Sequence, residues 1–286
     1  MKKLIIIGNG FDIAHGIESS YSNYKSWLLK KKDRDSSVFV SMMETFFSIQ
    51  RDVWGDLETA LGEYDENGII DYCKPDEEID YDHITRSTAA IEDGPDWLFQ
   101  PILEDAKENF KEWVDSIDIN NVEPSVNFPS NSIYFTFNYT ETLEQCYGIP
   151  EEKIFHIHGS RLQNDEYIFG HDNYRNPDDA YSDETELLFI QETKSKIIRW
   201  MNGFNKNTES IIDVHKDYFE ELKNIKIIYV YGHSFSKNDQ PYLERIITNT
   251  NKDIPWIIYY HSDTDFTNIQ NFIKKNGLTN TTLQKW

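Results

Sequence analysis

The 286-residue sequence predicts an α/β fold with a mostly parallel sheet flanked by helices. Short runs of Ile, Val, Tyr and Phe are near-continuously apolar, as strands buried on both faces of a parallel sheet are. Segments with helical spacing lie between these runs, and this alternation is typical of α/β proteins. Polar turns, three of which contain glycine, follow four of the runs directly.

Five apolar runs are predicted strands, and a weaker sixth candidate lies near the C-terminus. These are Leu4–Ile7, Ser132–Phe137, Lys153–Ile157, Ile225–Tyr231, Ile254–Tyr260 and Thr279–Lys285. Five segments between them carry apolar residues at helical spacing. They are Tyr21–Lys32, Val38–Glu63, Trp97–Ile117, Leu187–Trp200 and Asp239–Asn249.

Two regions differ from this alternation. Glu63–Pro95 is acidic and loop-like, and Asp172–Glu184 has the composition of a polar loop. Together with the helices around it, the first region forms a long insertion between the first two strands. The sequence therefore predicts a single domain over residues 1–286, with a helical and acidic-loop insertion at about 33–130.

The composition narrows the class of ligand. Lys and Arg total 28 against 50 Asp and Glu, so the formal net charge is −22. Such a field opposes binding to a nucleic acid, whereas a small anionic ligand held by backbone amides remains compatible with it. Cys73 and Cys146 have no metal-ligand spacing and indicate reduced thiols. No apolar run approaches a membrane span, and we expect a cytoplasmic protein.

The four polar turns predict a site at one edge of the sheet. They contain Gly8 to Asp12, Asn138, His158 with Gly159, and Gly232 to Ser234, with Asp239 shortly afterwards. The carboxyl ends of parallel strands share one edge, where open α/β sheets bind their ligands. This agreement among four strands is the strongest functional signal in the sequence.

The opening turn, Gly8-Asn9-Gly10-Phe11-Asp12, departs from the dinucleotide fingerprint G-x-G-x-x-G. Ile13 stands where the third glycine belongs, and no clear second strand ends in Asp or Glu about 20 residues later. Hydride transfer is therefore disfavoured. A glycine turn at a helix entry can still hold a pyrophosphate through its amides, and a tight structural turn is the alternative.

Two polar side chains at strand ends are candidates for chemistry. His156 and His158 are two residues apart, and if the chain leaves the sheet after the strand, only His158 faces the crevice. His156 then has a structural role. Asn138 lies between aromatic residues, where a buried amide needs several hydrogen-bond partners. Capping of a helix that begins near Thr140 is the alternative for Asn138.

Five motifs, GNGFDIAHGI, FNYTETLEQCY, IFHIHGS, IFGHD and IYVYGHSFSKND, occur in that order. They resemble the abortive-infection AbiH family of bacterial antiphage proteins, and WGDLE resembles that family's Trp-x-x-Leu-Glu element. The match extends from the first strand to the helix after the fourth. The same order of motifs is similar, more distantly, to sirtuin-like NAD-binding domains, which implies a Rossmann-like fold.

By the sirtuin-like resemblance, Asn138 would hold the nicotinamide ribose or an attacking water, and His158 would be the catalytic base. Gly8, Gly10 and Asp12 would lie along the phosphates and ribose, and Gly232 and Ser234 would border the adenosine side. The acid usual two residues after the Asn is Thr140 here. The full set of expected NAD-binding residues is Gly8, Asn9, Gly10, Phe11, Asp12, His15, Gly159, Gly232, His233, Ser234 and Asp239.

Three functions remain open at this stage. The first is an antiphage NAD glycohydrolase that uses no metal, since an Asn amide and one His suffice for a cationic leaving group. The second is non-catalytic nucleotide sensing or partner binding, and self-association and an activating or inhibitory protein partner also remain open. The third is a metal-dependent phosphoesterase or nuclease. Its ligands would come from Asp12, His156, His158, His171, Asp172, His233 and Asp239.

Overall fold

The computed structural model describes residues 2–47, 52–74 and 84–286. The chain divides into two compact units. The first comprises Met1–Ser20, Trp113–Ile168 and Thr208–Trp286, and it contains the sheet. The second consists of two excursions from the first, Tyr21–Glu112 and Phe169–Asn207.

The sheet of the first unit has six strands, all parallel, and this confirms the predicted α/β fold. Their order is β3-β2-β1-β4-β5-β6, the arrangement of dinucleotide-binding folds. The strands are β1 (Lys2–Ile7), β2 (Ser132–Thr136), β3 (Ile154–His156), β4 (Ile225–Tyr231), β5 (Trp256–Tyr260) and β6 (Thr281–Lys285). The strand order reverses between β1 and β4, so the switch point of the sheet lies there.

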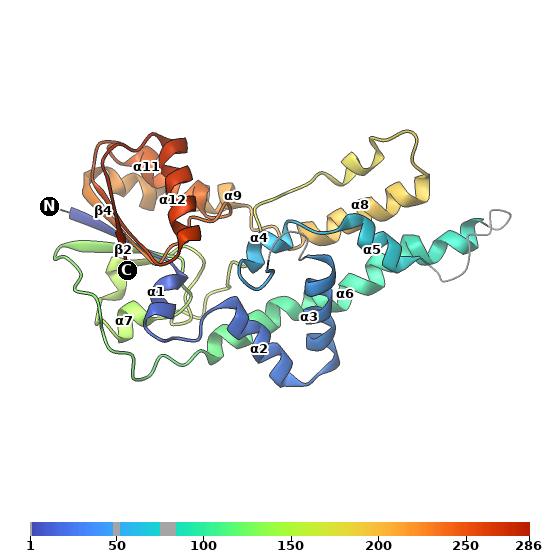
Figure 1. The fold of residues 1–286 in the computed structure, drawn as a ribbon, viewed down its shortest axis with the longest axis horizontal. Coiled ribbons are helices and arrows are strands. Elements are labelled where there is room, and N and C mark those ends of the chain that lie inside the picture. The colour runs from blue at the N-terminus through green and yellow to red at the C-terminus, as the bar shows by residue number, and fades with distance from the viewer. Residues whose placement is uncertain (1, 48–51, 75–83) are drawn as a thin grey trace. The chain divides into compact units, whose positions relative to one another are not determined.

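Alternate residues of the strands point to opposite faces of the sheet and pack into two apolar cores. On one face, Leu4, Ile6 and Phe135 pack with helices from the C-terminal third of the chain. These helices are α9 (Thr208–Val214), α10 (Lys216–Glu221), α11 (Gln240–Asn249) and α12 (Asp263–Asn276). On the other face, Ile5 and Ile7 pack with residues of α1 (Asn9–Ala14) and α7 (Thr142–Gln145). Figure 1 shows α11 and α12 on one side of the strands and α1 and α7 on the other.

The second unit is helical. It contains α2 (Tyr21–Lys31), α3 (Arg34–Phe46), α4 (Leu57–Leu61), α5 (Glu66–Cys73), α8 (Leu188–Asn202) and most of α6 (Ile84–Ser116), whose last turn belongs to the first unit. Short 3₁₀ turns occupy Glu151–Lys153, Pro177–Tyr181 and Leu222–Asn224. The predicted single helix over Val38–Glu63 is wrong, because α3 and α4 are separate helices on either side of the undescribed residues 48–51.

The predicted loop over Glu63–Pro95 is also wrong in its described parts, where α5 and the start of α6 are helical. Gly94 and Pro95 lie inside α6, although this pair ordinarily ends a helix. A side chain at Gly94 would come within 2.5 Å of the Cys73 sulfur, so glycine is needed for α5 to pack on α6. Pro95 cannot bond the Ile91 carbonyl, whose oxygen lies 3.3 Å from the Thr193 hydroxyl of α8.

A buried ion pair joins the two sequence segments of the second unit. The Lys206 ammonium, fully buried, lies 3.2 Å from Glu58 Oε2, and Gly170 donates its amide to Glu58 Oε1. The Lys206 amide also donates to the His171 carbonyl. The WGDLE and IFGHD motifs are thus in contact within this unit through the carboxylate of Glu58.

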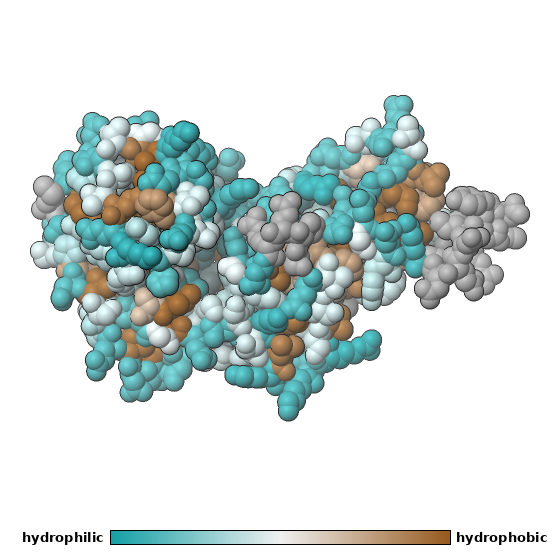
Figure 2. Space-filling view, viewed as in Figure 1, coloured by the Kyte–Doolittle hydropathy of each residue, from teal (hydrophilic) through white to brown (hydrophobic). Residues whose placement is uncertain are grey.

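Most of the visible surface of each unit is hydrophilic, with apolar side chains in separate patches (Figure 2), as the acidic composition implies. Leu187 and Leu188, at the start of α8, are both more than half exposed. Within the described ranges, no helix combines the length and apolar character needed to cross a bilayer.

The Glu58–Lys206 pair yields a prediction about stability. Lys206→Met leaves a buried carboxylate without its cation, and we expect a loss of roughly 3–5 kcal/mol in the free energy of unfolding. Lys196→Met removes a more exposed cation beside Asp93 and Asp96, and should cost less than about 1 kcal/mol. Urea unfolding followed by circular dichroism measures both. Equal losses of unfolding free energy in the two variants would show that burial does not make the Glu58–Lys206 pair more important for stability than an exposed pair.

Candidate functional site

The four polar turns of the sequence lie at the carboxyl ends of four adjacent strands. β3, β2, β1 and β4 are neighbours in the sheet, and all run in the same direction. Asn138 and His158 each follow their strand by two residues, and Gly8 and Gly232 by one. The predicted convergence on one edge, which includes the switch point between β1 and β4, is therefore confirmed.

The turns after β1 and β4 pack backbone against backbone. The Gly10 amide donates to the Gly232 carbonyl at 2.8 Å, and the Gly8 amide donates to the Tyr231 carbonyl at 3.0 Å. A Cβ on Gly8 or Gly10 would lie 2.7 or 2.8 Å from the Gly232 oxygen. Gly232 has a φ of +64°, and its Cβ would lie 2.1 Å from the Phe11 nitrogen. Contact between the two turns therefore requires all three glycines.

The same contact removes donors from the phosphate site that the sequence predicts. The amides of Gly8 and Gly10 are engaged as described, and the Phe11 amide donates to the Gly8 carbonyl at 2.9 Å. In this conformation none of the three amides can donate to a phosphate. The glycines that suggested a phosphate cradle are explained by the packing of the turns.

Asp12, on α1, is fully buried and forms a polar cluster with the turn after β2. The Thr140 hydroxyl donates to Asp12 Oδ2, and the hydroxyls of Thr140 and Thr142 are 3.1 Å apart. Burial raises the pKa of the Asp12 carboxyl, against opposing effects of Thr140, Thr142, Asn138 and His15. Within the described chain, Asp12 Oδ1 has no hydrogen-bond partner.

Asn138 is held by its backbone rather than by its amide group. Its N–H donates to the Thr136 hydroxyl at 3.0 Å, and its carbonyl accepts a hydrogen bond from His156 Nδ1 at 2.8 Å. The side chain is buried, and its amide atoms have no partner of good hydrogen-bond geometry among the described residues, although the amide is close enough to Asp12 to lower the pKa of that carboxyl. The Asn138 side chain therefore does not cap the helix that follows, α7, which was the alternative for this residue.

The two histidines of the HIHG motif have different surroundings. His156 lies between the Asn138 carbonyl and Glu144 Oε1, each 2.8 Å from a ring nitrogen, as expected for a structural side chain. His158 is buried against aromatic rings: its centroid lies 5.5 Å from that of Phe137 and 5.4 Å from that of Tyr242. Asn138 contacts Thr136 and His156, whereas the His158 ring packs on Phe137 and Tyr242, so their joint action on one ribose stays a prediction.

The predicted residues after β4 form a second buried group. The Phe235 amide donates to His233 Nδ1, which places the proton of a neutral ring on Nε2, 3.6 Å from Asp239 Oδ2. The His233 ring packs on Phe137, with centroids 4.4 Å apart. Ser234 is exposed, and its carbonyl accepts from the Asn268 amide. Gly159 has a φ of +90°, and a Cβ there would lie 2.8 Å from the Glu166 oxygen.

Three other predicted ligand residues are engaged in contacts within the first unit. Phe11 is completely buried. The ring nitrogens of His15 contact the Phe11 carbonyl at 2.7 Å and the Tyr147 hydroxyl at 2.6 Å. The Asn9 side chain bonds Ser19 through both its oxygen and its nitrogen. These contacts give each residue a structural role that requires no nucleotide.

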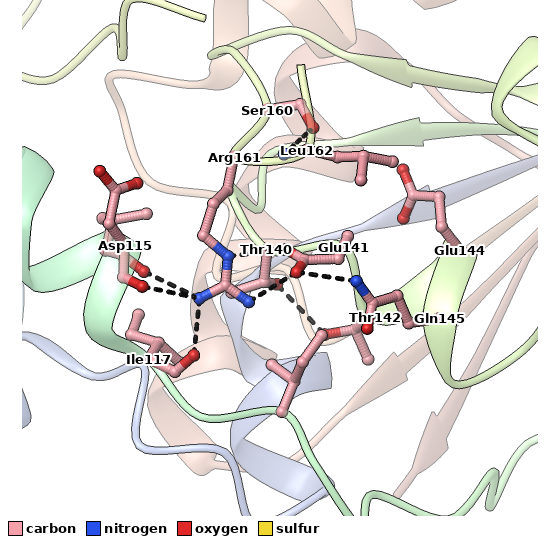
Figure 3. A network of polar contacts seen from close by, with 12 residues as sticks. Asp115, Ile117, Thr140, Glu141, Thr142, Glu144, Gln145, Ser160, Arg161 and Leu162 are labelled. Atoms are coloured by element: carbon pink, nitrogen blue, oxygen red, sulfur yellow. Dashed lines mark hydrogen bonds and ion pairs between the residues drawn. The ribbon is translucent and has the colours of Figure 1, made fainter. Parts of the chain in front are cut away.

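Sequence reasoning missed Arg161, which connects the turns after β2 and β3 (Figure 3). Its guanidinium forms a two-point ion pair with Glu141, with Nε–Oε2 and Nη2–Oε1 distances of 2.8 and 2.9 Å. Nη1 donates to the carbonyls of Ile117 and Val114, and so satisfies groups at the end of α6. The Arg161 amide also donates to the Tyr139 carbonyl. Its only sequence signal is a lone Arg just after a strand-end motif.

The metal hypothesis finds no cluster of ligands. Among the residues that the structure describes, no three His, Cys, Asp or Glu side chains are grouped to hold an ion. His171 and Asp172 belong to the second unit, whereas the other five proposed ligands belong to the first. Both ring nitrogens of His171 are engaged, by the Asn173 amide and the Met201 carbonyl, and burial lowers its pKa.

Comparison with known proteins gives one family match. The model of a family described as bacteriophage abortive infection AbiH matches residues 4–260, most of the chain. Neither curated proteins nor solved structures give a significant match. The sirtuin-like similarity is not among these findings.

Contact between the two turns yields a prediction. Gly16→Ala places a side chain at a φ of +78° with no atom within 4 Å, and should cost about 1–2 kcal/mol. Gly232→Ala combines a similar φ with a clash against the Phe11 nitrogen, and should lower the melting temperature considerably more. Calorimetric melting of both variants tests this. Equal shifts would mean that the turns separate without cost.

The contacts of Arg161 yield a second prediction, about the stability of the turns after β2 and β3. Arg161→Met leaves Glu141 largely buried without its cation, and should cost roughly 2–4 kcal/mol. Amide hydrogen exchange should also become faster in residues 138–142 and 158–162. Arg161→Lys keeps the charge without the planar fork, so it should recover only part of the loss. Arg245→Met, which removes an exposed pair with Asp213, is the control and should leave exchange in these turns unchanged.

Proposed function

The chain belongs to the bacteriophage abortive infection AbiH family, and from this premise we propose that it defends the bacterial cell by hydrolysing NAD to nicotinamide and ADP-ribose. Family membership places it among bacterial proteins of abortive infection, a defence against phage. The proposal adds the substrate and the reaction.

The observation that carries the proposal is a pair of buried side chains, Asp12 on α1 and Asn138 two residues after β2. By hydrogen-bond geometry, Asp12 Oδ1 and both amide atoms of Asn138 have no partner within the described residues, but the Asn138 side chain lies close enough to Asp12 to lower the pKa of its carboxyl. Both side chains are at least nine-tenths buried. A buried polar group without a partner costs about 1–3 kcal/mol. A ligand that supplies these hydrogen bonds would offset this cost when it binds. Strand order supports a nucleotide as that ligand.

The reaction needs few groups. The bond between ribose C1′ and the nicotinamide nitrogen breaks, and its electron pair leaves with the ring, which becomes neutral. Water forms the new bond to C1′ and loses a proton. In our proposal Asn138 orients the ribose or the water, and His158 accepts the proton. The buried setting of both side chains favours such positioning, because neither has many rotamers open to it.

The proposal makes a prediction about rates. Asn138→Ala and His158→Ala should each lower nicotinamide release from NAD by a factor of about 10² to 10⁴, because each removes a positioned group. His261→Ala, at an exposed position outside the four turns, should retain the wild-type rate. Chromatography of nicotinamide and ADP-ribose measures the rates, and thermal melts verify that each variant is folded.

Two outcomes would contradict the proposal. If His158→Ala releases nicotinamide as fast as wild type, His158 is not the base. If the wild-type protein binds NAD but cleaves it neither in solution nor in phage-infected cells, the chain senses a nucleotide instead of hydrolysing it.

A further inference from the structure

The turn after β2, residues 138–141, is held in place at every position. Each residue of the turn is bonded to a group from another element: Asn138 to His156, Tyr139 and Glu141 to Arg161, and Thr140 to Asp12. The bond at the first position uses the Asn138 carbonyl, so it fixes the backbone of that residue and leaves its amide group uninvolved. The residue that makes this bond is His156, at the end of β3.

The two hydrogen bonds of His156 specify its protonation. Nδ1 lies 2.8 Å from the Asn138 carbonyl oxygen, and Nε2 lies 2.8 Å from Glu144 Oε1. A carbonyl oxygen and a carboxylate oxygen are both acceptors, so both ring nitrogens donate and the ring is an imidazolium. The side chains of His156 and Glu144 are only 7% and 9% exposed. The two residues therefore form a charged pair in a largely buried setting.

Glu144 depends on His156 for its compensating charge. Its second oxygen, Oε2, is buried and has no hydrogen-bond partner among the described residues. Arg161 is engaged elsewhere, since its guanidinium bonds to Glu141 and to the Ile117 carbonyl. In Figure 3 the dashed lines of Arg161 run to Glu141 and none reaches Glu144. The charge on His156 is thus matched by a carboxylate that Arg161 does not use.

We propose that His156 and Glu144 form a charged pair that positions Asn138, with His156 as the positioning residue and Glu144 as its counter-ion. The inference rests on the proposed function, because the role of Asn138 in the reaction is the one given there. Hydrogen bonds from a charged donor are roughly twice as strong as neutral ones. An imidazolium therefore holds the Asn138 carbonyl more firmly than a neutral ring would, and the buried amide group keeps one orientation.

The protonation of His156 can be observed by two-bond ¹H–¹⁵N correlation spectra, which distinguish an imidazolium from either neutral tautomer. At neutral pH we expect protons on both ring nitrogens in the wild-type protein. In Glu144→Gln the new amide group can donate to Nε2, so His156 should become neutral and keep its proton on Nδ1. The signal is assigned by its absence in His156→Leu, and the exposed His261 provides a reference.

Positioning can be tested with the same two variants. His156→Leu removes the donor to the Asn138 carbonyl, so amide hydrogen exchange at Asn138 and Arg161 should become roughly tenfold faster. Nicotinamide release from NAD should lose a factor of roughly 10 to 10² in kcat. KM should change less, because the Asn138 amide is still present. Glu144→Gln keeps the bond to Asn138 and should retain most of the rate.

A double variant keeps the test valid if His156→Leu does not fold. His156→Leu alone leaves Glu144 buried without a cation, which is strongly destabilising. Combining it with Glu144→Leu removes both charges together and avoids that penalty. The double variant should be folded by circular dichroism and should show the same faster exchange and the same loss of kcat.

The outcomes separate this inference from the proposed function. A neutral His156 in the wild-type spectra would overturn the charged pair. A folded double variant with wild-type exchange at Asn138 and Arg161, or with the wild-type kcat, would overturn positioning by His156. Spectra and exchange rates require no NAD. If both agree with expectation while the wild-type protein never cleaves NAD, the proposed reaction is wrong and the positioning of the turn by His156 and Glu144 stands.

Discussion

The backbone contact between the turns after β1 and β4 determines how the rest of the first unit is built. The Gly10 amide and the Gly232 carbonyl meet at 2.8 Å, at the point where the strand order reverses. In many α/β proteins a crevice opens at this point and a ligand enters it. Here the two turns are in contact, and the buried Asp12 carboxyl bonds to the turn after β2, which also carries Asn138.

Burial of Asp12 follows from that arrangement. The turn after β1 leads directly into α1, which is packed on the sheet through the fully buried Phe11, and Asp12 is carried under the turn after β2. The hydroxyls of Thr140 and Thr142 meet it there, and Arg161 fixes the intervening Glu141. A carboxyl group is thus placed against Thr140, in the turn that carries Asn138. It comes from a residue 128 positions away.

Sequence reasoning succeeded where the signal is local. Buried strands such as Leu4–Ile7 are recognisable from their own residues, and the order of polar turns was enough to predict the shared edge. It failed where the cause lies in a distant partner. Gly10 needs to be glycine because of Gly232, and α6 continues through Pro95 beside a threonine of α8. The glycines suggested a phosphate, since a sequence does not reveal that another turn occupies the same space.

The acidity of the chain agrees with recognition at the nucleoside end of a nucleotide. A net charge of −22 opposes the approach of phosphates, and two internal cations are already paired, Arg161 with Glu141 and Lys206 with Glu58. Uncharged hydrogen bonds do not meet this obstacle, because a hydroxyl group carries no charge for the field to repel. The Asn138 amide, which is uncharged and buried, is a group of this kind. For NAD, the substrate that we propose, the pyrophosphate would then have to rely on donors other than the amides of Gly8, Gly10 and Phe11, which are already engaged.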